Sequence, residues 1–166
     1  RTAYLLGGRG DATLWALDLE NDSAPLVARP LARLVEDDDP QCNSGMDVGP
    51  DGRVYAVIRV DNPTGFVGRP HSKSHFVEKR WVHRLVRYDP AVGRVEDLGV
   101  VAIANPDFIN LDLRPHCHGY QTFPNGTVAP KDHHFSLKVN RDGEIYITTI
   151  YPLSLIHISE PTRRYA

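Results

Sequence analysis

Seven of the eight histidines fall between residues 71 and 134, in two polar stretches of the chain. Neutral imidazole is a common protein ligand for zinc, copper, iron and nickel. His116 and His118 flank Cys117, and in an extended segment two such rings point to the same side, about 7 Å apart at Cα. We expect a divalent-metal site for Zn, Mn or Ca. Its candidate ligands are His116, His118, His133 and His134.

The same stretches contain groups that suit a substrate next to such a metal. His71 and His75 are candidates for the general acid or base, because an imidazole titrates near neutral pH. Loop histidines are frequent and basic loop residues are usually solvated, so a site without metal or ligand is the alternative. Four polar residues are candidates for binding an anionic or sugar-like ligand: Asn43, Arg69, Arg114 and Lys131.

Two hairpins with Asp-Gly turns indicate which elements would position these groups. Residues 53–60 and 144–151 are β-branched and aromatic runs, and each follows an Asp-Gly pair that is typical of a tight turn. The residues before the turns, 45–49 and 135–140, are the expected partner strands. No long window has the apolar spacing of a helix. We therefore predict an all-β fold.

A second kind of hairpin joins residues 83–88 to residues 94–101 through a turn at 89–93. Residues 13–19 have the same pattern as the first strand of this hairpin, so that Asp18 occupies the position of Asp89. Joining the two kinds of hairpin gives a four-stranded antiparallel meander, whose middle copy covers about residues 45–101. The chain is then a β-propeller fragment of about two and a half four-stranded antiparallel blades. A β-sandwich is the structural alternative.

The connections differ at the two ends of these strands. Turns within each hairpin are tight, whereas the long connections, residues 61–82 and 102–134, leave from the opposite end, which we call the loop end. Long loops on a rigid scaffold commonly carry binding sites. All seven histidines lie on these connections or at their edges. A hairpin turning at Asn125-Gly126 would bring His116 or His118 back beside His133 or His134.

The last residues are expected to be foreign to the domain. Residues 153–163 read LSLIHISEPTR, which resembles the in-frame translation of a transposase-type sequencing adapter. We expect residues 153–166 to be a non-native tail and residues 1–152 to be a partial β-propeller domain. His157 is therefore excluded as a ligand. The chain starts at Arg1, and we expect any signal peptide to lie outside this sequence.

Composition narrows the classes of partner. Residues 1–152 keep 17 of the 19 basic and 20 of the 21 acidic residues, which leaves a formal charge of −3. Non-specific nucleic-acid binding needs a basic surface, so we expect no nucleic-acid partner. No apolar run approaches the roughly 20 residues that span a bilayer. Cys42 and Cys117 could form one disulfide in an exported protein or stay free thiols in a cytoplasmic one.

The segments DGRVYAVI, residues 51–58, and LVRYDPAVGRVEDLG, residues 85–99, resemble blades of the gluconolactonase-like and quinoprotein-like β-propeller families. The resemblance extends over most of residues 2–152 and favours a secreted or periplasmic location. It implies a metal-assisted hydrolase or lyase acting on a sugar acid or polysaccharide. Gluconolactonase-like propellers bind their metal through carboxylate and Asn ligands, and in this chain only Asn43 and Asn110 are comparable. The histidines of this chain are more similar to the His-rich metal site of a propeller polysaccharide lyase. The alternative is a non-catalytic propeller that binds a protein or glycan.

Overall fold

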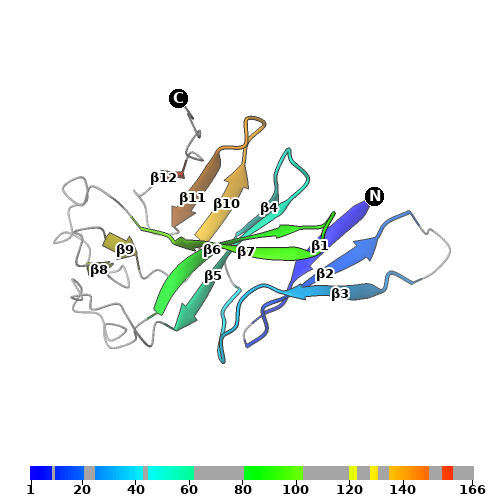
Figure 1. The fold of residues 1–166 in the computed structure, drawn as a ribbon, viewed down its shortest axis with the longest axis horizontal. Helices are drawn as coiled ribbons and strands as arrows, with labels where there is room; N and C mark the ends of the chain where they lie inside the picture. The colour runs from blue at the N-terminus through cyan, green and yellow to red at the C-terminus, as the bar shows by residue number, and fades with distance from the viewer. Residues whose placement is uncertain are drawn as a thin grey trace.

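The computed structural model describes residues 1–8, 10–20, 25–42, 45–61, 81–102, 120–122, 128–130, 135–149 and 155–158. Within these ranges the chain forms strands and turns and no helix, and every strand pair is antiparallel. The expected all-β, antiparallel fold is therefore confirmed. Figure 1 shows the strands gathered into separate sheets that follow one another along the chain.

Each sheet is a meander in which strands that are neighbours in sequence are neighbours in space. The first sheet contains β1 (Thr2–Leu6), β2 (Thr13–Asp18) and β3 (Ala28–Arg33). The middle sheet contains β4 (Met46–Val48), β5 (Val54–Asp61), β6 (Trp81–Asp89) and β7 (Arg94–Val100). The third sheet contains β10 (Phe135–Val139), β11 (Ile145–Thr149) and β12 (Leu155–Ile158). The middle sheet is the complete four-stranded meander that the sequence predicts.

The two Asp-Gly turns and the turn at residues 89–93 are present as the sequence predicts. Gly52 and Gly143 have φ angles of 75° and 84°, a conformation that glycine adopts at little cost. Between β6 and β7 the backbone N–H of Gly93 donates to the carbonyl of Asp89 at 2.9 Å. The smaller hairpin predicted around residues 120–129 is also confirmed, because β8 (Tyr120–Thr122) pairs with β9 (Val128–Pro130).

One strand was not expected from the sequence. Leu155–Ile158 pairs antiparallel with β11 as β12, and Tyr146 lies opposite His157 in its register. The segment belongs to the tail that resembles translated adapter sequence. An open strand edge pairs readily with an apolar, β-branched segment within reach. The pairing of β12 therefore indicates that the edge of β11 is open to another strand. It does not bear on where residues 153–166 come from.

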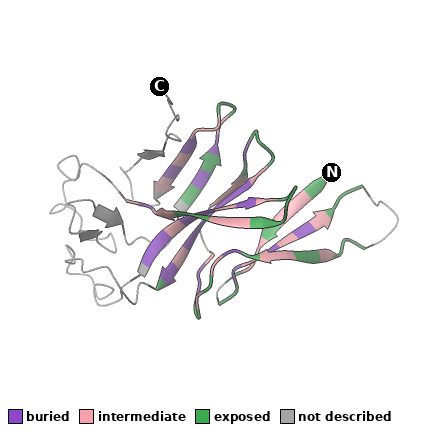
Figure 2. Ribbon diagram, in the orientation of Figure 1, coloured by how far each residue is buried: buried purple, intermediate pink, exposed green. Residues whose placement is uncertain are grey.

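The two central strands of the middle sheet, β5 and β6, have buried residues on both faces (Figure 2). Val54, Ala56 and Ile58 form one apolar cluster with residues of the first sheet, including Leu14. The alternate positions of the middle sheet form a second apolar cluster with residues of the third sheet, namely Tyr55, Val57 and Leu85 with Leu137, Val139, Ile145 and Ile147. The described sheets therefore form three layers, where a two-sheet sandwich would have two.

The sheets repeat the same orientation. Aligning the two Asp-Gly turns matches Ala56 to Ile147, and both side chains are buried towards the preceding sheet. Tyr55 and Val57 point the opposite way, towards the following sheet. Tyr4 matches Tyr55 and packs against the middle sheet in the same manner. Each sheet thus covers the next one with the same positions, as in a tandem stack of equal units.

Candidate functional site

None of the residues proposed from the sequence as site residues is among those that the structure describes. They fall in the long connections and, for Asn43, in the segment before β4. The structure therefore says nothing about whether these side chains meet. The residues outside the described ranges are Asn43, Arg69, His71, His75, Arg114, His116, His118, Lys131, His133 and His134.

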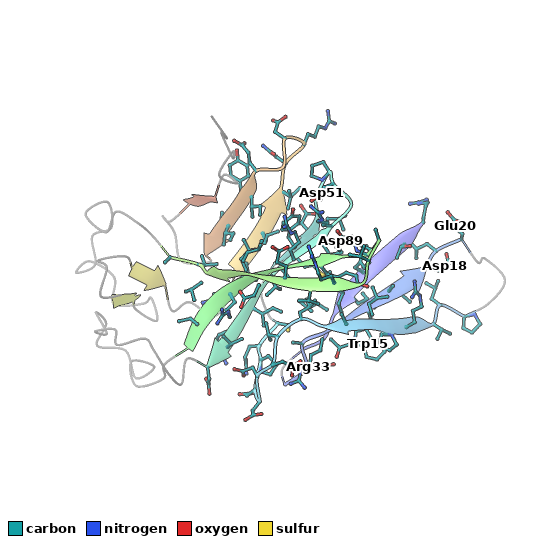
Figure 3. The ribbon with its side chains drawn as sticks, in the orientation of Figure 1. Trp15, Asp18, Glu20, Arg33, Asp51 and Asp89 are labelled. Carbon is teal, nitrogen blue, oxygen red and sulfur yellow. The ribbon has the colours of Figure 1, made fainter. Side chains whose placement is uncertain are left out.

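The two ends of the middle sheet differ as the sequence predicts, whereas in the first sheet the connection between β2 and β3, residues 19–27, is longer than the one between β1 and β2, residues 7–12. Figure 3 shows Asp18 and Glu20 at one end of the first sheet and Arg33 towards the other. The turns after β4, β6 and β10 are all tight, whereas residues 62–80 connect the far end of β5 to the start of β6. The loop end is therefore the end of the middle sheet at which β5 finishes and β6 begins.

A row of three polar residues crosses the middle sheet near the loop end. The backbone N–H of Gln41 donates to the carbonyl of Arg59 at 2.9 Å, and the N–H of Arg59 donates back at 3.0 Å. Arg59 lies directly opposite His83 in the pairing of β5 with β6. Side chains directly opposite in an antiparallel ladder share one face of the sheet. We call Gln41, Arg59 and His83 the polar row.

The polar row lies among apolar neighbours. His83 is fully buried and Gln41 is 7% exposed, whereas Arg59 is partly exposed. By alternation along β5 and β6 the row shares the face of Val57 and Leu85, which points towards the third sheet. A guanidinium binds carboxylates through paired N–H donors, and an imidazole can donate or accept. Charge-assisted hydrogen bonds are stronger where water is scarce, so this set of groups suits an anionic ligand.

Sequence reasoning missed two members of the polar row. It placed His83 at the edge of a long connection but assigned no role to Gln41 or Arg59. The available signal was Arg59 itself, the single charged residue within the apolar run from Val54 to Val60. Burying a charged side chain is costly unless it has a polar partner. The residue opposite Arg59 on the neighbouring strand is His83.

The acidic run at residues 36–39 is held in a turn by Asp37. Its carboxylate accepts hydrogen bonds from the backbone N–H groups of Asp39, at 3.0 Å, and of Asp61, at 3.1 Å. The guanidinium of Arg33 donates to the Asp37 carbonyl at 2.7 Å. These contacts fasten the connection after β3 to the end of β5. Among the residues with a described position, no group of three or more His, Cys, Asp or Glu side chains could hold a metal ion.

Cys42 carries a free thiol, which donates to the backbone carbonyl of Asp11 at 3.4 Å. Burial raises its pKa, the negative charge of Asp11 raises it further, and the resulting pKa is about 11. The thiolate is the nucleophilic form of cysteine, so this side chain is almost entirely in its unreactive state at neutral pH.

We expect Cys42 to react with iodoacetamide at pH 8 on the order of a hundredfold more slowly than an unperturbed thiol of pKa about 8.5. The measurement is the alkylation rate of Cys117→Ser, followed by mass spectrometry with and without denaturant. Denaturant should restore the ordinary rate. An equally fast reaction in the folded protein would show that the Cys42 environment is different from the one described.

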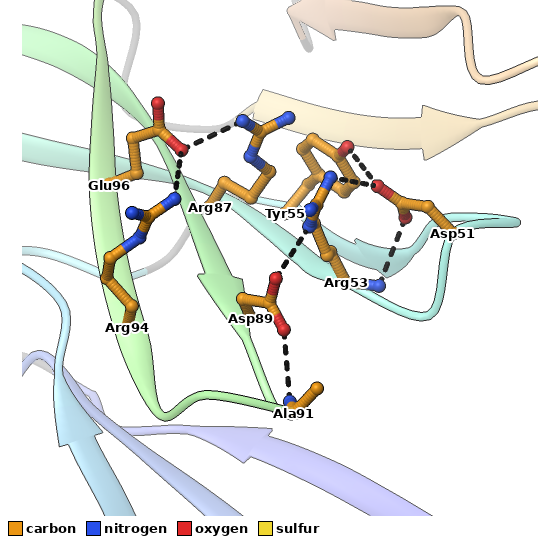
Figure 4. Close-up of polar contacts among 8 residues, drawn as sticks. All are labelled: Asp51, Arg53, Tyr55, Arg87, Asp89, Ala91, Arg94 and Glu96. Atoms are coloured by element: carbon orange, nitrogen blue, oxygen red, sulfur yellow. Dashed lines mark hydrogen bonds and ion pairs between the residues drawn. The ribbon is translucent and has the colours of Figure 1, made fainter.

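At the tight-turn end the charged side chains bind one another (Figure 4). The Nε of Arg53 lies 3.0 Å from Asp89 and its terminal nitrogen lies 3.3 Å from Asp51. The hydroxyl of Tyr55 donates to Asp51 at 2.9 Å. Arg87 lies 6.0 Å from the centre of the Tyr55 ring.

The network also extends to the last strand of the sheet. Arg87 binds Glu96 at 2.8 Å, and Arg94 lies 3.9 Å from the same carboxylate. The contacts link β5, β6 and β7 to the turn before β5. The charged side chains of this network therefore have partners within one sheet, and their contacts stabilise it.

The network makes stability depend on pH. The hydrogen bond from Arg53 lowers the pKa of Asp89, and the one from Arg87 lowers that of Glu96. Burial raises the pKa of Asp51, but hydrogen bonds from Arg53 and Tyr55 outweigh it, so that this pKa is also below its ordinary value of 3.8. The stabilisation is therefore complete above the ordinary carboxyl pKa and is lost as the pH falls through the lower pKa values of the folded state.

We expect the urea midpoint of the chain to fall between pH 5 and pH 3, and Asp89→Asn to reduce that fall. The asparagine keeps an oxygen for the backbone N–H of Ala91, which Asp89 binds at 3.0 Å, but loses the charge facing Arg53. The measurement is the urea midpoint against pH for both proteins. Asp38→Asn, at an exposed acidic position outside the network, is the matched control and should leave the slope unchanged. Equal slopes for wild type and Asp89→Asn would contradict the prediction.

Comparison with known proteins shows no relationship to this chain. No family model matches it, and neither a curated protein nor a solved structure has significant similarity to it. In the part of the chain with described coordinates, no helix is long and apolar enough to cross a membrane.

Proposed function

We propose that residues 1–152 are blades of a β-propeller of the gluconolactonase-like or quinoprotein-like type. Support comes from the tandem stack, in which each sheet covers the next with the same positions. The first strands of the middle and third sheets also lie next to each other, because the backbone N–H of Val139 in β10 donates to the carboxylate of Asp47 in β4 at 2.8 Å. Lys138 lies 2.9 Å from the same carboxylate. Blades that approach at their first strands are the arrangement of a propeller.

We further propose that the loop end binds an acidic sugar or polysaccharide with the help of a divalent metal. The observation that carries this proposal is the polar row, which places a guanidinium and a buried imidazole at the end of the sheet where the histidine-rich connections begin. His116, His118, His133 and His134 would hold the metal. The metal would supply Lewis-acid activation of a carbonyl or carboxylate.

In this proposal the other residues bind the substrate or transfer a proton. Arg59 binds the substrate carboxylate together with Arg69, Arg114 or Lys131. Asn43 donates to a hydroxyl, and His71 or His75 moves the proton that hydrolysis or elimination requires. Binding without turnover would instead be the activity of a non-catalytic propeller whose loop end recognises a glycan or protein.

The metal is tested on the full chain by elemental analysis after equilibration with Zn, Mn or Ca. We expect near-stoichiometric binding of one of these ions, and loss of most of it in His116→Ala/His118→Ala. His71→Ala should keep the metal and lose turnover of a uronic-acid polysaccharide or an aldonolactone. No bound metal, or equal metal in the double variant, would overturn the metal site.

Substrate binding is tested separately by titration with a galacturonate oligomer. Arg59→Gln should weaken binding about tenfold, the effect of losing one charge-assisted contact. Arg141→Gln, at an exposed arginine of the tight turn before β11, is the matched control and should bind as wild type. Equal binding by both variants would remove Arg59 from the site. Binding with no turnover by wild type would support the non-catalytic alternative.

A further inference from the structure

The two Asp-Gly turns have the same backbone conformation but different side-chain contacts. Gly52 and Gly143 have φ angles of 75° and 84°. In each turn the N–H of the glycine donates to the carbonyl three residues back, at 3.0 Å and 3.2 Å respectively. Asp51 and Asp142, which precede the glycines, are both exposed. Because backbone conformation and exposure are matched, a difference in the chemistry of the two carboxyl groups must come from their contacts.

The carboxylate of Asp51 is held by donors of its own hairpin (Figure 4). One oxygen accepts the backbone N–H of Arg53 at 3.0 Å. The other oxygen accepts the hydroxyl of Tyr55 at 2.9 Å and a terminal N–H of the Arg53 guanidinium at 3.3 Å. Hydrogen bonds to a carboxylate are stronger than those between neutral groups. This carboxyl group therefore cannot rotate without breaking contacts at both of its oxygens.

The carboxylate of Asp142 lacks the equivalent donors, because the sequence after its turn is different. Glu144 stands where the middle sheet has Arg53, and an ionised carboxylate cannot donate. The hydroxyl of Tyr146 donates to Glu144 at 2.9 Å. The side-chain oxygen of Asn140 accepts the backbone N–H groups of Asp142 and Glu144, both at 2.9 Å. Among the residues that the structure describes, none binds the carboxylate of Asp142. The contrast arises within the two hairpins and does not involve an adjacent sheet.

We propose that Asp142 is a site of spontaneous isomerisation to isoaspartate, and that Asp51 is protected from the same reaction. The backbone nitrogen of Gly143 bonds to the side-chain carboxyl carbon of Asp142, and the carboxyl hydroxyl leaves as water with the proton of the N–H. Water then adds to the main-chain carbonyl carbon of this succinimide ring and breaks its bond to the nitrogen. The chain now continues through the side-chain carboxyl carbon. One water is released and one is consumed, so the reaction needs no other reactant.

The contacts of each carboxyl group decide how easily the ring closes. Closure requires the carboxyl carbon to turn onto the nitrogen of the next residue, and glycine hinders this least because it has no side chain. At Asp142 the rotation breaks none of the contacts that the structure describes, whereas at Asp51 it breaks the hydrogen bonds from Arg53 and Tyr55. Loss of one charge-assisted hydrogen bond corresponds to a factor of about ten. This proposal is independent of the metal and the ligand proposed for the loop end.

Isomerisation at Asp142 changes the hairpin of β10 and β11. Isoaspartate adds one methylene carbon to the backbone of a turn whose length fixes the register of the flanking strands. Val139 pairs with Ile145 beside this turn. Both side chains belong to the apolar cluster between the middle and third sheets. We therefore expect isomerised molecules to unfold at a lower urea concentration than fresh protein.

The first test compares the two turns within one molecule. The full chain is incubated at neutral pH in water enriched in heavy oxygen, because each succinimide that reopens takes up one oxygen atom from water. Peptide mapping then locates the label and the isoaspartate. In the folded protein we expect about tenfold more at Asp142 than at Asp51, and in urea equal amounts, since glycine follows both. Equal amounts in the folded protein, or the same tenfold difference in urea, would overturn the proposal.

The second test exchanges the residues that follow the two turns. Glu144→Arg should give Asp142 a donor and lower its isomerisation to that of Asp51, whereas Arg53→Gln should raise the isomerisation of Asp51 alone. In Arg53→Gln the rate at Asp142 is the internal reference, because general unfolding would raise both sites together. Arg29→Gln, at an exposed arginine of β3, is the matched control and should leave both sites as in wild type. An unchanged rate at Asp142 in Glu144→Arg would show that contacts do not decide between the turns, and the proposal would be wrong.

Discussion

Gly45→Ala is expected to be among the most destabilising single substitutions in this protein, at about 3 kcal/mol. A Cβ on Gly45 would lie 2.7 Å from the carbonyl carbon of Ser136 and closer still to the backbone nitrogen of Leu137. These atoms belong to the backbone of β10, so no side-chain rotation can relieve the clash. Overpacking of this kind typically costs 1 to 3 kcal/mol, and here the first strands of two sheets would have to separate.

The measurement is the free energy of unfolding from urea denaturation. Gly8→Ala is the matched control, because no described atom lies within 4 Å of the Cβ that it would add. We expect it to change stability by about 0.5 kcal/mol or less. If Gly45→Ala were as stable as wild type, the third sheet would not pack against residues 45–48 as described.

Hairpins were predictable from sequence because their signals are local. The Asp-Gly pairs at residues 51 and 142 require a residue with positive φ beside two β-rich runs, and the structure has those turns. Likewise, Asp18 and Asp89 accept hydrogen bonds from Glu20 and Ala91, the backbone N–H two residues on, at 3.0 Å in both cases. Turns that depend on residues close together in sequence can therefore be predicted from one amino-acid sequence.

Contacts between sheets were less predictable, since they join residues far apart in sequence. Apolar runs such as β5 indicated burial on both faces, but they did not show which sheet covers which face. The pairing of Gln41 with Arg59 is an isolated bridge outside the named strands, and no repeating pattern in the sequence marks it. Candidate ligands on the long connections were chosen by residue type alone, because such connections have no periodicity from which a position can be derived.

A second large effect is expected on both interfaces of the middle sheet. Ile58 and Ile147 are both fully buried, the first against the first sheet and the second against the middle sheet. Replacing either with alanine removes buried methyl groups and leaves a cavity, for which the typical cost is 2 to 5 kcal/mol. We expect about 3 kcal/mol for each, measured by urea denaturation, with Val92→Ala as an exposed control close to zero.

The comparison of the two substitutions tests the stack itself. A sheet with one solvated face would have a costly position on one side and a tolerant one on the other. Equal costs require that both interfaces exist in solution, and the double variant should then lose the sum of the two, because the sites belong to separate clusters. A cost near zero for Ile147→Ala alone would mean that the third sheet is detached from the middle one. A near-zero cost for Ile58→Ala alone would mean that the first sheet is detached from the middle one.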